Sequence, residues 1–261
     1  MKIPFFHVDA FTNKVFAGNP AGVCLLEEWL PNKTLQKIAA ENNLPETAFL
    51  VRGKTEYHLR WFSPAVEIDL CGHATLASAF VLHLTLSDLP HTLRFKTMSG
   101  MLKVEKQNDL YILDFPVRRA EKNDPPDALL QGLGIKPQSV FKARDFLTVF
   151  DNEEQILSLA PDFTQLASLD CLGIIATAPG REVDFVSRFF APAVGIPEDP
   201  VTGSSHCTLI PYWADKKGKN ILTARQLSKR GGELFCEYRT DRVLIGGKAA
   251  LYLQGEITVP E

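Results

Sequence analysis

The feature that most constrains this chain is a segment that occurs twice. RWFSPAV (Arg60–Val66) precedes a glycine turn and an apolar helical pattern, and RFFAPAV (Arg188–Val194) precedes the same succession. The identical residues of the two segments share one offset, about half the chain length. Gly72 and Gly203 pair at a slightly longer offset, so the second copy contains a short insertion.

The likeness continues downstream, where GMLKVEKQNDLYI (100–112) resembles GELFCEYRTDRVL (232–244). Arrays of short units usually have periods of about 20–50 residues, so a repeat this long indicates a duplicated domain. We expect two similar domains, 1–120 and 121–261, divided at the polar, Pro-rich stretch EKNDPP. Two placements of the last strand stay open, in the C-terminal domain or returned to the N-terminal one.

Each half contains short alternating segments typical of strands around one apolar helical pattern. The helices are predicted over Ala74–Leu84 and from about Ser204 to Lys216. The predicted fold class is therefore α+β, with two pseudo-symmetric domains that each curl a mostly antiparallel, β-barrel-like sheet around a central helix. Phe11–Gly22 is predicted as a loop and Asn43–Glu46 as a turn, because both are rich in breakers.

Composition excludes several classes of function. A net charge of −3 provides no basic footprint for nucleic acid, and the longest apolar runs are too short to span a bilayer. Five widely spaced cysteines without a CxxC motif, and an N-terminus without an apolar signal core, predict a reducing cytoplasm. The six histidines form no HExxH or HxH pattern, so no dedicated metal site is predicted.

Both central helices are predicted to begin at a glycine, Gly72 before His73 and Gly203 before Ser204. A helix start presents unpaired N–H groups and about half a positive charge, which suits a carboxylate or a phosphate. One such turn is most simply structural. Two matched turns, the second close to Asp199, favour a ligand site in a cleft between the domains.

Four motifs lie in order over nearly the whole chain: VDAFTNKVFAGNPAGVC, NLPETAFL, RWFSPAVEIDLCGHATLASAF and EDPVTGSSH. Together they resemble the PhzF family of phenazine biosynthesis-like isomerases, within the wider diaminopimelate epimerase-like fold. The resemblance implies two pseudo-symmetric domains with the active site between them, no cofactor and a homodimer. The family's site residues fall on the following positions: Glu46 as the acid/base, Gly72 and His73 at the first helix start, and Asp199, Gly203 and Ser204 at the second.

These residues suit an isomerase of a small carboxylate, because one close carboxylate can remove a proton from carbon and return it elsewhere. Glu46 is then the proton shuttle, and His73 and Asp199 position the substrate and assist proton transfer. The two helix starts, with Gly72 and Gly203, bind the substrate carboxylate. Without the resemblance, Glu46 would be assigned to a solvated turn, because glutamate is mostly exposed.

Two other functions stay open. A two-base racemase or epimerase of an amino acid needs a base on either face of the carbon, and epimerase relatives of the fold use a cysteine at each helix start. Cys71 stands at the first start, but we match the second position to Pro200, which has no thiol. The other alternative is a protein that binds a small carboxylate without turning it over.

Overall fold

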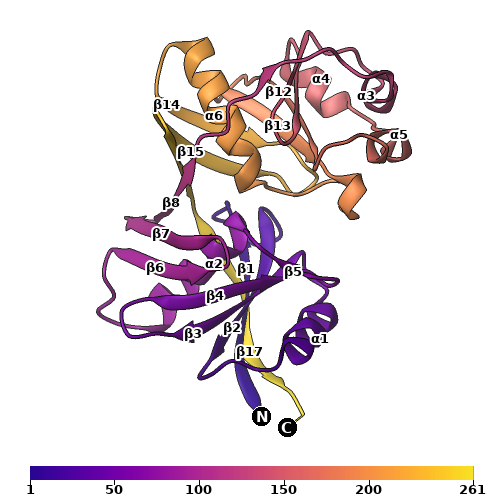
Figure 1. Cartoon of the computed structure of the whole chain (residues 1–261). Helices are drawn as coiled ribbons and strands as arrows, with labels where there is room; N and C mark the ends of the chain where they lie inside the picture. Colours follow the sequence, from indigo (N-terminus) through magenta and orange to yellow (C-terminus); the bar gives the residue numbers. More distant parts are fainter. Residues whose placement is uncertain (261) are drawn as a thin grey trace. The chain divides into compact units, whose positions relative to one another are not determined.

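The computed structural model describes residues 1–260, and these form two compact units (Figure 1). The first unit contains Met1–Asp114 and the segment that begins at Gly246, and the second contains Phe115–Ile245. The sequence led us to expect a division between residues 120 and 121. The strand β17 (Ala249–Thr258) lies in the first unit. The chain passes between the units within β8 (Leu110–Pro116) and β16 (Arg242–Gly247).

The first unit is a mixed sheet with two helices. Its other elements are β1 (Lys2–Ala10), β2 (Asn19–Leu26), α1 (Asn32–Asn42), β3 (Glu46–Arg52), β4 (Tyr57–Phe62), β5 (Glu67–Ile68), α2 (Gly72–Thr85), β6 (Thr92–Thr97) and β7 (Gly100–Gln107). The strand β1 is antiparallel to both β2 and β17. From β2 the pairings are parallel to β3, antiparallel to β4, parallel to β6 and antiparallel to β7.

The second unit repeats this order of pairings. Its elements are β9 (Glu121–Lys122), α3 (Asp127–Leu133), β10 (Ser139–Lys142), β11 (Phe146–Val149), α4 (Glu153–Ser158), α5 (Phe163–Ala167), β12 (Ile174–Pro179), β13 (Phe185–Phe190), the 3-10 helix η1 (Pro192–Val194), α6 (Gly203–Lys217), β14 (Ile221–Gln226) and β15 (Gly232–Arg239). From β11 the pairings are parallel to β12, antiparallel to β13, parallel to β14 and antiparallel to β15. The predicted fold class is confirmed, and the duplication extends to strand topology.

The central helix of the first unit, α2, is enclosed by the sheet. It packs against β1, β2, β3, β7 and β17 (Figure 1). Its sequence, GHATLASAFVLHLT, is apolar on every face, and such a helix is stable only when it is buried all round. It is 14 residues long, and no helix within residues 1–260 combines the length and apolarity needed to cross a membrane.

Two local predictions were wrong. β2 begins at Asn19, so the second part of the predicted loop is strand, and Glu46 is the first residue of β3 rather than part of a turn. Pro20 pairs with Asp9 of β1 and precedes the ladder between β2 and β3, which begins at Ala21. Gly22 fits the strand because a Cβ there would lie 3.0 Å from both Phe5 and Thr47. Close packing, rather than a turn, explains this glycine.

Each copy of the repeated segment holds the same ion pair. In the first, Arg60 Nε lies 2.6 Å from Glu67 Oε1 and Nη2 lies 2.7 Å from Oε2. In the second, Arg188 Nε lies 2.7 Å from Glu198 Oε1 and Nη2 lies 3.0 Å from Oε2. These forked contacts fix the planes of both groups. Each pair links the strand that carries the arginine to the segment that leads to the central helix.

The central helix of the second unit carries a fully buried histidine. Nδ1 of His206 is 2.8 Å from the carbonyl oxygen of Thr202, to which its N–H donates. Nε2 has no hydrogen-bond partner within residues 1–260. Burial lowers the pKa of His206 to about 4, because a charged ring would lose its hydration without gaining a partner.

This burial predicts a loss of stability in acid. The unfolded chain binds a proton at His206 near pH 6.5, whereas the folded chain does so only near pH 4. The free energy of unfolding should therefore fall as pH drops from 7.5 to 4, by on the order of 3 kcal/mol from this group. Urea unfolding at several pH values would measure it. His206→Gln should show a shallower pH dependence, whereas the exposed control His91→Gln should not. An unchanged slope in His206→Gln would contradict the assignment.

Candidate active site

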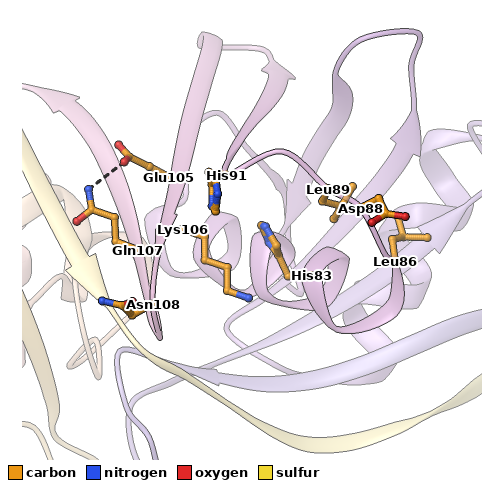
Figure 2. Close-up of a pocket in the computed structure, with 9 residues that line it drawn as sticks. All are labelled: His83, Leu86, Asp88, Leu89, His91, Glu105, Lys106, Gln107 and Asn108. Atoms are coloured by element: carbon orange, nitrogen blue, oxygen red, sulfur yellow. Dashed lines mark hydrogen bonds between the residues drawn. The ribbon is translucent and has the colours of Figure 1, made fainter.

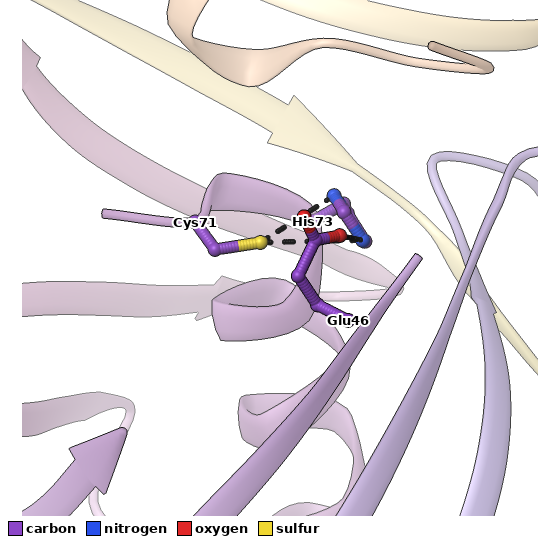
Figure 3. A group of neighbouring side chains, drawn as sticks. All are labelled: Glu46, Cys71 and His73. Carbon is purple, nitrogen blue, oxygen red and sulfur yellow. Dashed lines mark hydrogen bonds and ion pairs between the residues drawn. The ribbon is translucent and has the colours of Figure 1, made fainter. Parts of the chain in front are cut away.

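The structure brings together the site residues that were predicted in the first unit. Glu46 begins β3 and His73 is the second residue of α2. Their side chains are 11% and 7% exposed, and His73 Nε2 lies 3.0 Å from Glu46 Oε2 (Figure 3). The contact is an ion pair when His73 is protonated.

Cys71 is the third member of this group. It is the N-cap residue of α2, and its Sγ lies 3.6 Å from His73 Nδ1 and 4.0 Å from Nε2 (Figure 3). Burial raises the pKa of the Cys71 thiol, and the Glu46 carboxylate acts in the same direction while His73 opposes them. Gly72, between Cys71 and His73, is the first residue of α2.

Asn19 completes the surroundings of His73, and the sequence did not reveal it. This fully buried residue begins β2, and its Nδ2 lies 3.2 Å from His73 Nδ1. In this orientation Nδ1 accepts the contact, and the ring hydrogen lies on Nε2, toward Glu46. The only signal in the sequence was its place before Pro20 in a segment expected to be a loop.

The imidazole of His73 is held near a negative charge. Burial lowers the pKa of His73, but the Cys71 sulfur and the Glu46 carboxylate outweigh burial and raise this pKa well above 6.5. The amide of Asn19 can serve both charge states, since turning it over presents Oδ1 to an imidazolium. The group thus contains a carboxylate, an imidazole and a thiol within reach of one another.

In the second unit, Asp199, Gly203 and Ser204 also lie close together. Gly203 begins α6. Asp199 Oδ2 accepts a hydrogen bond from the hydroxyl of Thr202, the N-cap residue of α6. Gln226 braces the turn, because its Oε1 accepts from the Thr202 N–H at 2.8 Å and its Nε2 donates to the Asp199 carbonyl at 2.8 Å. These bonds fix the approach to the helix start.

The sequence also gave no indication of a cation beside the start of α6. Arg144, just before β11, donates from Nη2 to Ser204 Oγ at 3.2 Å. The same guanidinium contacts the buried Asp145 at 3.1 Å and 2.9 Å. Asp145 thereby orients a half-exposed guanidinium at the first turn of α6. No motif marks Arg144, because its relation to Ser204 is purely spatial.

A cavity of about 770 Å³ lies elsewhere in the first unit (Figure 2). Its lining consists of His83, Leu86, Asp88, Leu89, His91, Glu105, Lys106, Gln107 and Asn108. It contains none of the predicted site residues. His83 uses Nδ1 to donate to the Ala79 carbonyl at 2.9 Å, which is a structural role. We therefore assign chemistry to the Glu46 group and not to this cavity.

Comparison with known proteins identifies the family of this chain. A family model described as phenazine biosynthesis-like protein, PhzC-PhzF, matches residues 8–255. The chain belongs to the PhzF family. A protein named an uncharacterized isomerase in Pseudomonas aeruginosa is 52% identical over 257 residues, covering 98% of this chain and 99% of the relative. A phenazine biosynthesis-like domain-containing protein of Bos taurus is 42% identical over 288 residues, covering 99% and 100%. The chain is an isomerase of the PhzF family.

Solved structures agree with this assignment. A PhzF-family crystal structure from Enterococcus faecalis has a TM-score of 0.97 and 48% identity, covering 99% of this chain and 100% of that one. A probable proline racemase from Agrobacterium radiobacter has a TM-score of 0.65 at 10% identity, covering 99% and 93%. The racemase shares the fold alone. Both the predicted family and its epimerase-like fold are confirmed.

The two helix starts of this PhzF protein can now be matched residue by residue. The N-cap residues are Cys71 in α2 and Thr202 in α6, and both have extended backbone angles. Thr202, not Pro200, is thus the counterpart of Cys71. The sequence match to Pro200 lay two residues too early. A second thiol is still absent at the matching position.

The second unit also lacks a counterpart of Glu46. Arg60 lies opposite Phe49 in one unit, and Arg188 lies opposite Ala176 in the other. Counting back equally along β3 and β12 matches Glu46 to Gly173. A Cβ at Gly173 would lie 2.3 Å from Phe189 Cζ, so no side chain fits there. The duplication has left the carboxylate in one unit only.

Proposed function

We propose that this isomerase moves a proton between two carbons of a small carboxylate, with Glu46 as the single acid/base. The observation that carries the proposal is the buried carboxylate of Glu46, whose Oε2 lies 3.0 Å from His73 Nε2. The absence of a matching base at Gly173 favours one base over two. A single base suits migration of a proton, whereas inversion requires a base on each face.

The proposed reaction needs no redox partner. Glu46 takes a proton from one carbon, the electron pair moves through an adjacent double bond, and the same proton is delivered to a second carbon. His73 stabilises the resting carboxylate as an ion pair, and Asn19 holds the ring in position. Burial slows the exchange of the carried proton with water, so most turnovers return it to the substrate and a fraction incorporate solvent hydrogen.

We assign substrate binding to the groups at the two helix starts. In the second unit these are Arg144, Ser204 and the first N–H groups of α6 after Gly203, and Asp199 contacts a polar group of the substrate. A guanidinium, a hydroxyl and a helix start together suit a carboxylate. The Gly72 N–H group has the same role in the first unit.

We propose further that the enzyme is a cytoplasmic homodimer. The family resemblance supports the dimer, and five free cysteines support a reducing compartment. Sedimentation equilibrium should give twice the 29.0 kDa mass of one chain. A mass of one chain at micromolar concentration would contradict the dimer.

The acid/base role predicts the effect of Glu46→Gln. This change keeps the shape of the side chain and removes its basicity. The rate of deuterium wash-in from deuterated water at substrate carbon should fall at least about 100-fold. The assay uses NMR on a panel of small amino and cyclic carboxylates, and thermal shift reports folding and binding.

The exposed control Glu41→Gln should behave as wild type. Equal exchange by wild type and Glu46→Gln would rule out the proposed base. Panel members that bind wild type tightly yet neither isomerise nor exchange would favour a binding protein over an enzyme.

The carboxylate-binding role predicts the effect of Arg144→Met. Losing a charged hydrogen-bond donor should raise KM about 10- to 100-fold, with a smaller change in kcat. Steady-state kinetics on a substrate from the panel would measure both constants. Arg119→Met is a matched control in the same unit, because Arg119 pairs with Asp215 on an exposed surface. An unchanged KM in Arg144→Met would remove Arg144 from the site.

A further inference from the structure

The Glu46 group combines three kinds of metal ligand. A carboxylate oxygen of Glu46, the Sγ of Cys71 and a ring nitrogen of His73 all lie within 4.8 Å of one another, and all three residues are buried (Figure 3). The distance from His73 Nε2 is 3.0 Å to Glu46 Oε2 and 4.0 Å to Cys71 Sγ. Oxygen, sulfur and nitrogen therefore converge on one small volume in the first unit.

These separations are close to those of a tetrahedral site. Zinc binds thiolate sulfur at about 2.3 Å, imidazole nitrogen at about 2.0–2.1 Å and carboxylate oxygen at about 2.0–2.2 Å. Pairs of ligand atoms around such an ion are then roughly 3.3–3.6 Å apart. The observed 3.0 Å and 4.0 Å lie on either side of this range, and all three ligand atoms lie within 4.8 Å of one another. Small side-chain rotations would thus create a three-ligand site with one open position.

The surroundings of His73 suit coordination through Nε2. A metal-bound histidine usually hydrogen-bonds through its other nitrogen, which fixes the ring. Here Nδ1 lies 3.2 Å from the side-chain amide of Asn19. With a metal on Nε2, the ring hydrogen would move to Nδ1 and the turned amide would accept it through Oδ1. The outer partner that an imidazole ligand needs is therefore already present.

The choice of ion follows from the ligands. A thiolate selects against magnesium and calcium, which prefer oxygen, and mixed sulfur, nitrogen and oxygen ligands suit zinc. We propose that Glu46, Cys71 and His73 bind one zinc-like divalent ion, which holds the Glu46 carboxylate and thereby inhibits the enzyme. The binding stands on geometry alone, whereas the inhibition rests on the proposed function.

Cobalt(II) is the probe, because it replaces zinc and reports its ligands by absorption. Full-length reduced protein, freed of metal with EDTA and desalted, is titrated with Co²⁺. We expect saturation at one ion per chain, with tetrahedral bands in the visible and a sulfur-to-cobalt band in the near ultraviolet. Zn²⁺ should then displace Co²⁺ and bleach both.

Variants locate the ion. Cys71→Ser should abolish the sulfur-to-cobalt band, and Glu46→Gln should retain it with affinity lowered at least about tenfold. Cys171→Ser is the matched control, because Cys171 is the half-buried cysteine outside the group and its loss should change neither band. Absence of the band in wild type, or its survival in Cys71→Ser, would overturn the proposal. Should Cys71→Ser fail to fold, unchanged affinity in Glu46→Gln would overturn it equally.

Two separate measurements distinguish failure of the proposed metal site from failure of the proposed isomerase function. Deuterium wash-in by the metal-free enzyme tests the isomerase chemistry, and the cobalt spectrum tests the site. Exchange without cobalt binding would overturn the metal site only. Cobalt binding without exchange would count against the proposed base only. Where both are present, Zn²⁺ should stop exchange and EDTA should restore it, and exchange that persists at saturating Zn²⁺ would overturn the inhibition.

Discussion

The enclosure of α2 by its sheet is the constraint on which the first unit depends. A helix that is apolar on all faces needs burial, and the buried residues of α2 run from His73 in its first turn to Leu82. Polar groups at that turn then need partners inside the protein. Asn19 and Glu46, at the starts of β2 and β3, lie beside His73 and meet that need. The candidate site is thus a consequence of burying a helix start.

Duplication preserved the scaffold and not the chemistry. Both units keep the alternation of parallel and antiparallel pairings and the forked ion pair between arginine and glutamate. At the helix starts the copies differ, since Cys71 and His73 in one unit correspond to Thr202 and Ser204 in the other. Glu46 corresponds to Gly173, whose missing side chain leaves room for Phe189. One copy therefore holds the buried carboxylate, and the other holds a cation beside a hydroxyl.

The internal repeat and the hydrophobic periodicity were enough to predict the two similar units and their central helices. The matched glycines predicted both helix starts, and the motif around Glu46 predicted its place in the site. Asn19 was missed because a residue before proline resembles a turn, whereas its contact with His73 depends on the position of β2 beside α2. Arg144 was missed because its contact with Ser204 depends on the fold and not on any motif. No sequence motif revealed the proposed metal ligands, because Glu46 lies on a strand far from Cys71 and His73 in the sequence.

The pairing of β1 with β17 fixes when the first unit can be completed. Residues 2–10 form one strand of this sheet, and the partner along one of its edges is residues 249–258. During synthesis the ribosome must add all of the second unit before that partner exists. The second unit can close first, because its strands are continuous in the chain. Until then, β1 presents an open edge to other chains and chaperones in the cell.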